Sequence, residues 1–282
     1  MTIGKGAARL ATAGVLALLM AGCDGGESVE RGNIDYEQFT AQQIFERGEF
    51  DLERNKPKLA AQSFAEVERL YPYSALAKRA VIMQAFSHHQ ARAYEDSRSA
   101  AQRYIDFYPA DADAAYAQYL LALSYYDQID EIGRDQKLTF QALQALREVI
   151  ELYPESQYAN AARLKFDLAY DHLAAKEMEV GGYYLKRDNF AAAANRFRTV
   201  VEDFQTTTHT AEALYRLVEV YLSLGLVNEA RTAGAILGYN FRGTDWYADA
   251  FALLSGKGYS LEAAGDSWLN EIYRQTVLGR WL

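Results

Sequence analysis

Hydrophobic positions recur three and four residues apart through most of the chain between residues 34 and 240. This spacing predicts amphipathic helices, because residues three and four apart share one face of a helix. A repeated motif ends every second helix, an aromatic residue followed by proline or its equivalent: Tyr71-Pro72, Tyr108-Pro109, Tyr153-Pro154 and Phe204-Gln205. Proline cannot continue a helix, so we expect the second helix of each pair to end at this joint.

Alignment on these joints places residues of alternating size at matching positions. Eight residues beyond each proline or its equivalent stands an alanine, and eight residues further stands His88, Tyr125, Tyr170 or Tyr221. The second helices carry their own alanine and large apolar residue: Ala60 and Phe64, Ala101 and Tyr104, Ala142 and Leu146, Ala193 and Phe197. Alternating small and large residues are what closely packed helix pairs require.

The segment 211–230 matches the leading positions of the tetratricopeptide (TPR) consensus. The chain is therefore predicted to be all-α, a superhelical array of about five TPR-like helix pairs with a concave groove. The expected units are 34–72, 73–109, 110–154, 155–205 and 206–240, followed by a partly helical extension, 241–282.

The joints lie 37, 45 and 51 residues apart, whereas a regular TPR repeats about every 34 residues. The excess residues form an insertion around 128–136 in the third unit and a long first helix, 157–185, in the fourth.

Residues 1–22 have the three parts of an export signal: the basic residues Lys5 and Arg9, an apolar run from Leu10 to Met20, and two small residues. The apolar run is about 11 residues long, and a membrane span needs about 20. We therefore expect a signal peptide and not a permanent transmembrane helix.

Cys23 is the only cysteine, which excludes a disulfide within the chain. The stretch 19–23 resembles a bacterial lipobox, which implies acylation of the Cys23 thiol and a lipid anchor followed by a flexible tether, 23–33. The alternative is an unmodified secreted protein. Asp24 complicates the destination, because in enteric bacteria an aspartate after the lipidated cysteine tends to retain a lipoprotein at the inner membrane.

Composition, charge and the missing motifs argue against several classes of function. The formal net charge is −9, and no basic stripe with interleaved aromatic residues is present, so nucleic acid is not an expected partner. The four histidines, His88, His89, His172 and His209, show no metal-ligand spacing. The sequence has no Gly-x-Ser-x-Gly motif, and residues 255–259 lack the ends of a phosphate-binding loop. We expect no enzyme, metal or cofactor.

Several motifs together resemble the BamD (ComL-type) family of outer-membrane assembly lipoproteins. They are the lipobox, the tether, five TPR-like pairs with an insertion in the third, and the stretches 133–136, 153–159, 173–180, 183–184 and 194–196. The resemblance implies a periplasm-facing scaffold, lipid-anchored at the outer membrane, in the machinery that folds β-barrel proteins. Its implied partners are the barrel subunit BamA, other lipoproteins of the machinery and unfolded outer-membrane proteins.

The resemblance also implies where these partners bind. The BamA-facing half would include Glu177, Tyr184, Arg187 and Arg196. The same four residues lie at or near the end of the long fourth-unit helix, and tyrosine and arginine often anchor interfaces. The substrate would enter a groove of units one and two, near Phe45, Phe64, Tyr73 and Phe86.

Two other functions remain as alternatives. Another periplasmic TPR lipoprotein, a pilus-secretin pilotin or a cell-division coordinator, would show regular spacing near 34 residues or an N-terminal coiled coil, and neither is present. An envelope enzyme with a TPR handle would need a catalytic domain, and about 40 residues after Gly238 are too few.

Overall fold

The computed structural model describes residues 34–132, 134–263 and 268–276. Contacts divide the chain into two units, Met1–Gln38 and Phe39–Leu282. In the described part of the first unit, a short 3₁₀ turn, η1 (Tyr36–Gln38), is closed by Asp35, whose carboxylate accepts from the amide of Glu37 and the side chain of Gln38. Cys23, the export signal and the tether predicted at 1–33 lie outside the described residues.

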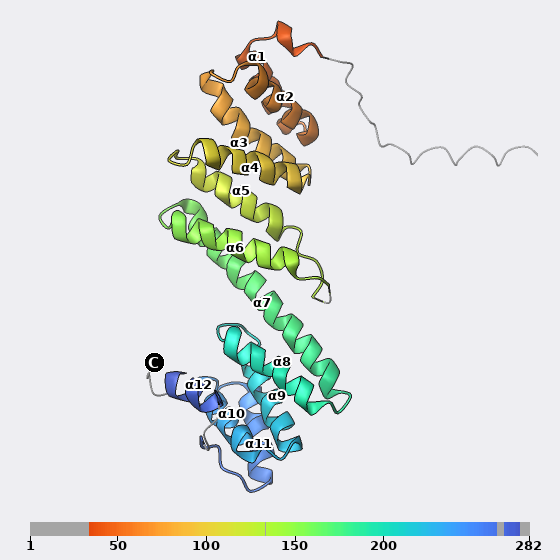
Figure 1. Ribbon diagram of the computed structural model, residues 1–282, viewed down its shortest axis with the longest axis vertical. Coiled ribbons are helices and arrows are strands. Elements are labelled where there is room, and N and C mark those ends of the chain that lie inside the picture. The colour runs from red at the N-terminus through yellow and green to blue at the C-terminus, as the bar shows by residue number, and fades with distance from the viewer. Residues whose placement is uncertain (1–33, 133, 264–267, 277–282) are drawn as a thin grey trace, which may run out of the picture. The chain divides into compact units, whose positions relative to one another are not determined.

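The second unit is a succession of paired α-helices (Figure 1). The helices are α1 (Ala41–Glu53), α2 (Pro57–Leu70), α3 (Ala75–Gln90), α4 (Tyr94–Phe107), α5 (Ala114–Tyr126), α6 (Lys137–Leu152), α7 (Gln157–Leu185), α8 (Phe190–Asp203), α9 (Thr210–Ser223), α10 (Val227–Asn240), α11 (Asp245–Gly256) and α12 (Trp268–Thr276). The described residues contain no strand, and the predicted all-α fold is confirmed. No helix in the described ranges is long and apolar enough to cross a membrane.

The joint between successive pairs has one backbone geometry, used five times. The aromatic residue that follows each second helix has φ between −133° and −125°, and its amide donates to the carbonyl four residues earlier. These residues are Tyr71, Tyr108, Tyr153, Phe204 and Phe241. Phe241 was not predicted, because neither a proline nor a clear repeat follows it in the sequence.

The turn inside a pair is also repeated. Asn55, Arg92, Asp188 and Gly225 lie in these turns and have φ between 56° and 76°, and the amide of the next residue donates to the carbonyl five residues before itself. Gly258 ends α11 in the same way, with φ 78°. This is the usual way to end a helix with one left-handed residue. In the third pair, residues 127–136 separate α5 from α6, where the insertion was predicted.

Paired helices approach closely where a glycine on one faces a ring on the other. A Cβ atom added at Gly48 would lie 2.7 Å from the ring of Phe64, and one at Gly181 would lie 2.4 Å from the ring of Phe197. Both rings are buried, with exposures of 0 and 1%. The missing side chain on α1 or α7 is therefore what admits the aromatic ring of α2 or α8.

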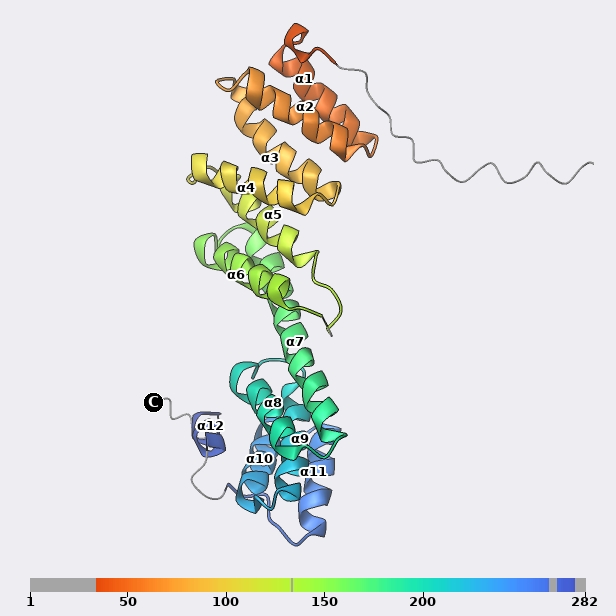
Figure 2. The ribbon, with the colours of Figure 1, turned by 45° about the vertical axis from the view of Figure 1, so that its right-hand side comes forward.

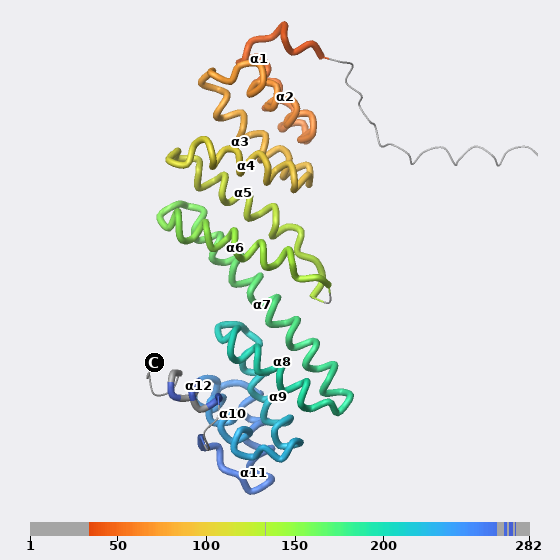
Figure 3. Tube along the Cα trace, in the orientation of Figure 1, coloured from red at the N-terminus to blue at the C-terminus, as the bar shows by residue number. Residues whose placement is uncertain are grey.

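α7 belongs to two helix layers at once. Its first half stacks on α5 and α6, where Tyr158 lies against Tyr116, and its second half pairs with α8 through Gly181 and Phe197. Figures 2 and 3 show it continuing without a break from α6 to α8. Its 29 residues confirm the predicted long helix, and it contributes to both apolar cores of the chain.

The second joint is held by one carboxylate. Asp111 accepts from the Lys78 ammonium, from the buried Tyr104 hydroxyl at 2.7 Å and from the amide of Asp113 at 3.0 Å. The Lys78 hydrogen bond is the main reason why the pKa of Asp111 falls to about 2. The carboxylate therefore stays ionised at neutral pH and ties α3 to the end of α4.

The residues after Phe241 continue the packing. α11 contacts α9 and α10, and α12 buries Leu269 and Ile272 in the same core. The Trp268 indole donates to the Tyr221 hydroxyl at 3.3 Å, and the guanidinium of Arg198 lies 4.6 Å from the centre of the Trp268 ring system. The tail thus closes the apolar side of the last repeats.

We expect Gly181→Ala to lower the free energy of unfolding by about 1–3 kcal/mol, because its new methyl group would displace the Phe197 ring. The control is Gly182→Ala, whose Cβ would meet nothing within 4 Å. This neighbour should stabilise the helix by about 0.5–1 kcal/mol, since alanine loses less backbone entropy than glycine. Urea unfolding of both variants measures the difference. Equal stabilities would show that the glycine is not needed for the close approach.

Candidate functional site

The first candidate site lies where the end of α7 meets α8, and it is called here the α7–α8 site. It comprises Glu177, Tyr184, Arg187 and Arg196, with Tyr183 beside them. Glu177 on α7 and Arg196 on α8 form an ion pair at 3.1 Å, with the Arg196 side chain 45% exposed. The fold thus brings together two of the predicted residues that are 19 positions apart.

An open depression lies beside this ion pair. It is lined by Tyr184, Ala192, Asn195, Arg196 and Thr199. Ala192 and Thr199 were not predicted, although they stand four residues before and three after Arg196 and so share its helix face. The lining offers a phenol ring, an amide, a hydroxyl and a guanidinium, which suits a polar protein surface better than a small apolar ligand.

Arg187 lies at the end of α7 and interacts with a neighbouring ring. Its guanidinium is 3.6 Å from the centre of the Tyr183 ring, and it also donates to the Tyr183 carbonyl at 3.3 Å. Tyr183 is 53% exposed and meets Tyr184 edge to face. The two tyrosines therefore link the exposed Arg187 to the depression.

Of the four predicted substrate residues, two are buried and two are at least partly exposed. The prediction that the buried pair lines a groove is wrong. Phe45 and Phe64 are 1 and 0% exposed and pack edge to face, with ring centres 5.1 Å apart. They hold α1 to α2 and are not available on a groove surface, because the close approach of the two helices at Gly48 places both rings between them. Tyr73 is fully exposed after the first joint, and Phe86 is half-buried against the core of α3–α7.

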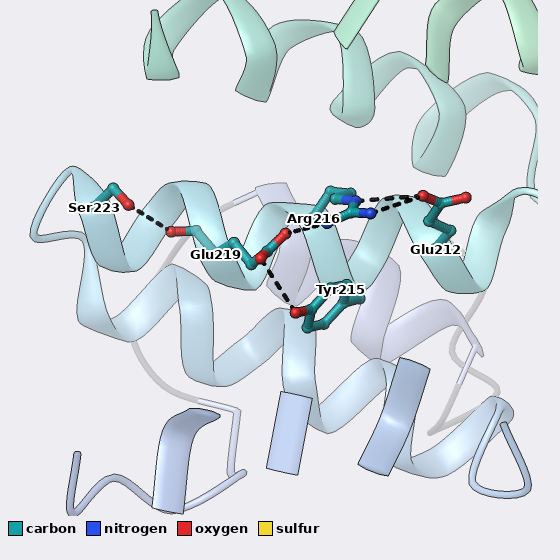
Figure 4. A network of polar contacts seen from close by, with 5 residues as sticks. All are labelled: Glu212, Tyr215, Arg216, Glu219 and Ser223. Atoms are coloured by element: carbon teal, nitrogen blue, oxygen red, sulfur yellow. Dashed lines mark hydrogen bonds and ion pairs between the residues drawn. The ribbon is translucent and has the colours of Figure 1, made fainter. Parts of the chain in front are cut away.

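A polar network on α9 was missed by the sequence analysis (Figure 4). Arg216 donates to Glu212 at 3.2 Å and to Glu219 at 2.7 Å, and Glu219 also accepts from the Tyr215 hydroxyl at 3.1 Å. Burial, followed by the nearby Glu219, raises the pKa of Tyr215. The charges satisfy one another, so the network fixes α9 against Trp246 of α11. The sequence does contain this pattern, because glutamates stand four residues before and three residues after Arg216.

Three of the described histidines, His88, His89 and His209, each lie near one carboxylate. His89 lies 3.0 Å from Asp127, and His209 lies 3.4 Å from Asp171. Burial lowers the pKa of His88. Within the described ranges, no group of three His, Cys, Asp or Glu side chains could hold a metal ion.

Comparison with known proteins decides the family. The family model described as "YfiO: Outer membrane lipoprotein" matches residues 37–236. The chain belongs to this family. The match ends before Phe241, so α11 and α12 lie beyond the part that the family model covers.

Two relatives of this chain are named as outer membrane protein assembly factor BamD. The protein of Caulobacter vibrioides is 43% identical over 244 residues, covering 86% of this chain and 79% of the relative. That of Rickettsia prowazekii is 42% identical over 211 residues, covering 75% of this chain and 84% of the relative. The predicted resemblance to the BamD family is confirmed.

The solved structures that match include TTC0263, a thermophilic TPR protein of Thermus thermophilus. It is 18% identical with a TM-score of 0.36, and the match covers 75% of this chain and 99% of that one.

The two arginines should differ in their effect on stability. We expect Arg216→Met to lower the free energy of unfolding by about 1–3 kcal/mol, because Glu212 and Glu219 would lose the charge that satisfies them. Arg196→Met should change it by less than about 1 kcal/mol, since water reaches its guanidinium, which is 45% exposed and pairs with one glutamate. Thermal and urea unfolding of the two variants and the parent measure these changes in the free energy of unfolding. A larger loss at Arg196 would make the α7–α8 site a structural element.

Proposed function

We propose that this chain is a scaffold subunit of the machinery that assembles β-barrel proteins in the outer membrane. The observation that carries the proposal is the 43% identity to a protein named as an outer membrane protein assembly factor, extending over 86% of the chain. A helical repeat scaffold suits this role because its helix faces and edges offer long surfaces for other proteins. In this role the chain binds partners and is not an enzyme.

The C-terminal repeats bind the barrel subunit BamA in this proposal. The α7–α8 site supports it, since Arg196, Tyr184 and the exposed Arg187 supply the residue types that most often dominate binding energy at interfaces. The Glu177–Arg196 ion pair orients the guanidinium before binding, which lowers the entropy cost of ordering it.

Unfolded outer-membrane proteins are the proposed substrate, received by repeats nearer the N-terminus. Of the four residues first assigned to that surface, only Tyr73 and Phe86 have side chains with exposed area. A surface for unfolded chains needs apolar side chains that water reaches, because their burial supplies the binding free energy.

The proposed location is the periplasmic face of the outer membrane, through acylation of Cys23. Several acyl chains would give nearly irreversible anchoring, since each buried methylene contributes about 0.8 kcal/mol. Asp24 makes retention at the inner membrane the competing outcome.

Affinity purification of the chain from detergent-solubilised membranes should recover a large β-barrel protein. Arg196→Glu should reduce that recovery about tenfold or more, because it places a like charge beside Glu177 and removes an interface guanidinium. The control is Arg69→Glu, which alters an exposed arginine on α2 that also has an ion pair.

The double swap Glu177→Arg with Arg196→Glu separates two explanations of that loss. It restores the internal pair but not a partner's contact with Arg196, so recovery should stay low. Purification of the parent chain without any β-barrel protein would contradict the proposed function itself.

Cys23→Ala should move the protein from the membrane fraction to the soluble periplasmic fraction, because a lone polar tether has no membrane affinity. A density gradient that separates the inner from the outer membrane also tests the effect of Asp24. If the outer membrane is the normal destination, Asp24→Ser should have the same distribution between the two membranes as the parent protein. A Cys23→Ala protein that stays in the membrane as strongly as the parent would contradict lipid anchoring.

A further inference from the structure

The first helix pair presents an aromatic ring to solvent where α1 leads into α2. Phe50 lies one turn before the end of α1, and its side chain is 51% exposed. The guanidinium of Arg54, four residues later, lies 4.5 Å from the centre of the Phe50 ring. α1 opens the second unit, and its main helix neighbours are α2 and α3 (Figure 1). An exposed ring costs hydrophobic free energy, which a partner that covers it would recover.

Basic residues surround this ring. Arg54, Lys56 and Lys58 are all exposed, and no carboxylate among the described residues forms an ion pair with any of them. Glu53 is the single acidic residue at positions 53–58, so this stretch has a net charge of +2 from three basic residues and one acidic residue. The whole chain has a formal net charge of −9. The turn is therefore a local positive region on an acidic protein.

The carboxylates nearest in sequence do not cancel this positive charge. Glu49 accepts from the Arg79 guanidinium at 3.1 Å, and Glu46 accepts from the Gln42 amide at 2.7 Å. Asp51 is only 2% exposed. The exposed cations of the turn are thus left to interact with something outside the chain.

Other turns inside helix pairs have a different charge pattern. The α3–α4 turn is followed by Glu95 and Asp96, whose side chains are 95 and 67% exposed. The α7–α8 turn repeats the ring and arginine, as Tyr183 and Arg187, but Asp188 comes next in the chain. The helix-pair fold does not itself require a basic turn, so the lysines of the first pair call for another explanation.

We propose that this surface, defined by Phe50, Arg54, Lys56 and Lys58 and called the α1–α2 turn surface, contacts the anionic phospholipid headgroups of the membrane that holds the chain. The inference rests on the lipid anchoring in the proposed function and adds a second membrane contact, made by protein side chains. Phe50 enters the boundary between headgroups and acyl chains, and the three cations lie at the level of the phosphates.

The residue types match a peripheral membrane contact of moderate strength. An aromatic ring flanked by cations combines buried apolar area with attraction to anionic lipids. Each basic residue close to an anionic surface raises the affinity about fivefold. Sites for anionic lipids commonly hold about four to eight basic residues. Three cations and one ring therefore give a weak contact, which depends on a second attachment.

The predicted tether supplies that attachment. Residues 23–33 are 11 residues, which reach about 36–40 Å when fully extended. α1, with 13 residues, is about 20 Å long. The turn at its end is thus within reach of a membrane that holds Cys23. A short flexible linker raises the effective concentration to the millimolar range, so a weak contact becomes occupied. Without the anchor the contact is lost on dilution, which agrees with the release expected for Cys23→Ala.

The test measures sedimentation of residues 24–282 with phospholipid vesicles. This chain lacks the export signal and Cys23 but contains every described helix. It should bind vesicles of phosphatidylethanolamine and phosphatidylglycerol, and it should bind vesicles of phosphatidylcholine alone about tenfold more weakly or less. Binding should fall with added salt, because the Debye length shrinks from about 10 Å at 0.1 M to about 3 Å at 1 M.

Two variants test the two parts of the surface separately. Lys56→Gln with Lys58→Gln should weaken binding to the anionic vesicles about 25-fold, at about fivefold for each charge. Phe50→Ser should weaken it about tenfold or more, because the ring no longer enters the membrane boundary. Salt should affect the binding of the lysine variant less than that of the parent.

The chain offers a matched control for each variant. Lys137→Gln with Lys257→Gln makes the same change in net charge at two exposed lysines elsewhere. Phe251→Ser removes a ring that is 50% exposed on α11, close to the 51% of Phe50. Both controls should bind vesicles as the parent does. Equal losses in a variant and its control would overturn the proposal, because net charge or general hydrophobicity would then explain the binding.

Other outcomes would also overturn the contact: no binding of the parent to anionic vesicles, or a Lys56/Lys58 variant whose only change is weaker recovery of a protein partner. If the parent still recovers a β-barrel protein from membranes, such a result leaves the proposed function standing. A parent that binds anionic vesicles through this surface but recovers no β-barrel protein would contradict the proposed function and support the membrane contact.

Discussion

The close approach of two helices, made possible by a residue with no side chain, underlies the packing of this chain. Gly48 and Gly181 each leave room for a buried phenylalanine ring of the partner helix. If the helices rotated, the ring would meet a Cβ atom in place of the glycine, and if they moved apart, a cavity would open beside the ring, so the ring favours one separation and one register. Because one pair buries only part of its apolar surface, the next pair must stack on it, and the aromatic joint delivers the chain to that place.

The length of α7 is the feature of this packing that most affects the candidate functional site. A regular unit would turn back after about 14 residues, but α7 continues for 29 and so belongs to the third layer and the fourth. Its first half has α5 and α6 as neighbours and leaves Leu164 and Leu168 uncovered. Its second half pairs with α8 and ends in the tyrosines and arginine of the α7–α8 site. The long helix therefore connects the third helix layer directly to the α7–α8 site.

Charged side chains have different structural roles along the chain. Near the second joint, Asp111 collects three donors and holds two helices together. On α9, Arg216 and its two glutamates satisfy one another inside a partly buried network. Arg196 differs from these because water reaches its ion pair with Glu177. Charges that are exposed and incompletely satisfied contribute little to folding and can serve recognition.

The sequence by itself determined the helices, the joints at Tyr71, Tyr108, Tyr153 and Phe204, and the long helix in the fourth unit, because these depend on local periodicity and on residues that end helices. It also pointed to the family, and it placed Glu177, Tyr184 and Arg196 in one region. Tertiary structure alone decided that Phe45 is buried while Leu164 and Leu168 are exposed. A helix pattern says which residues share a face, but only the packing of neighbouring helices decides which face is covered. The joint at Phe241 was likewise visible only in three dimensions, since its backbone repeats the geometry of the other four although neither a proline nor a clear repeat follows it in the sequence.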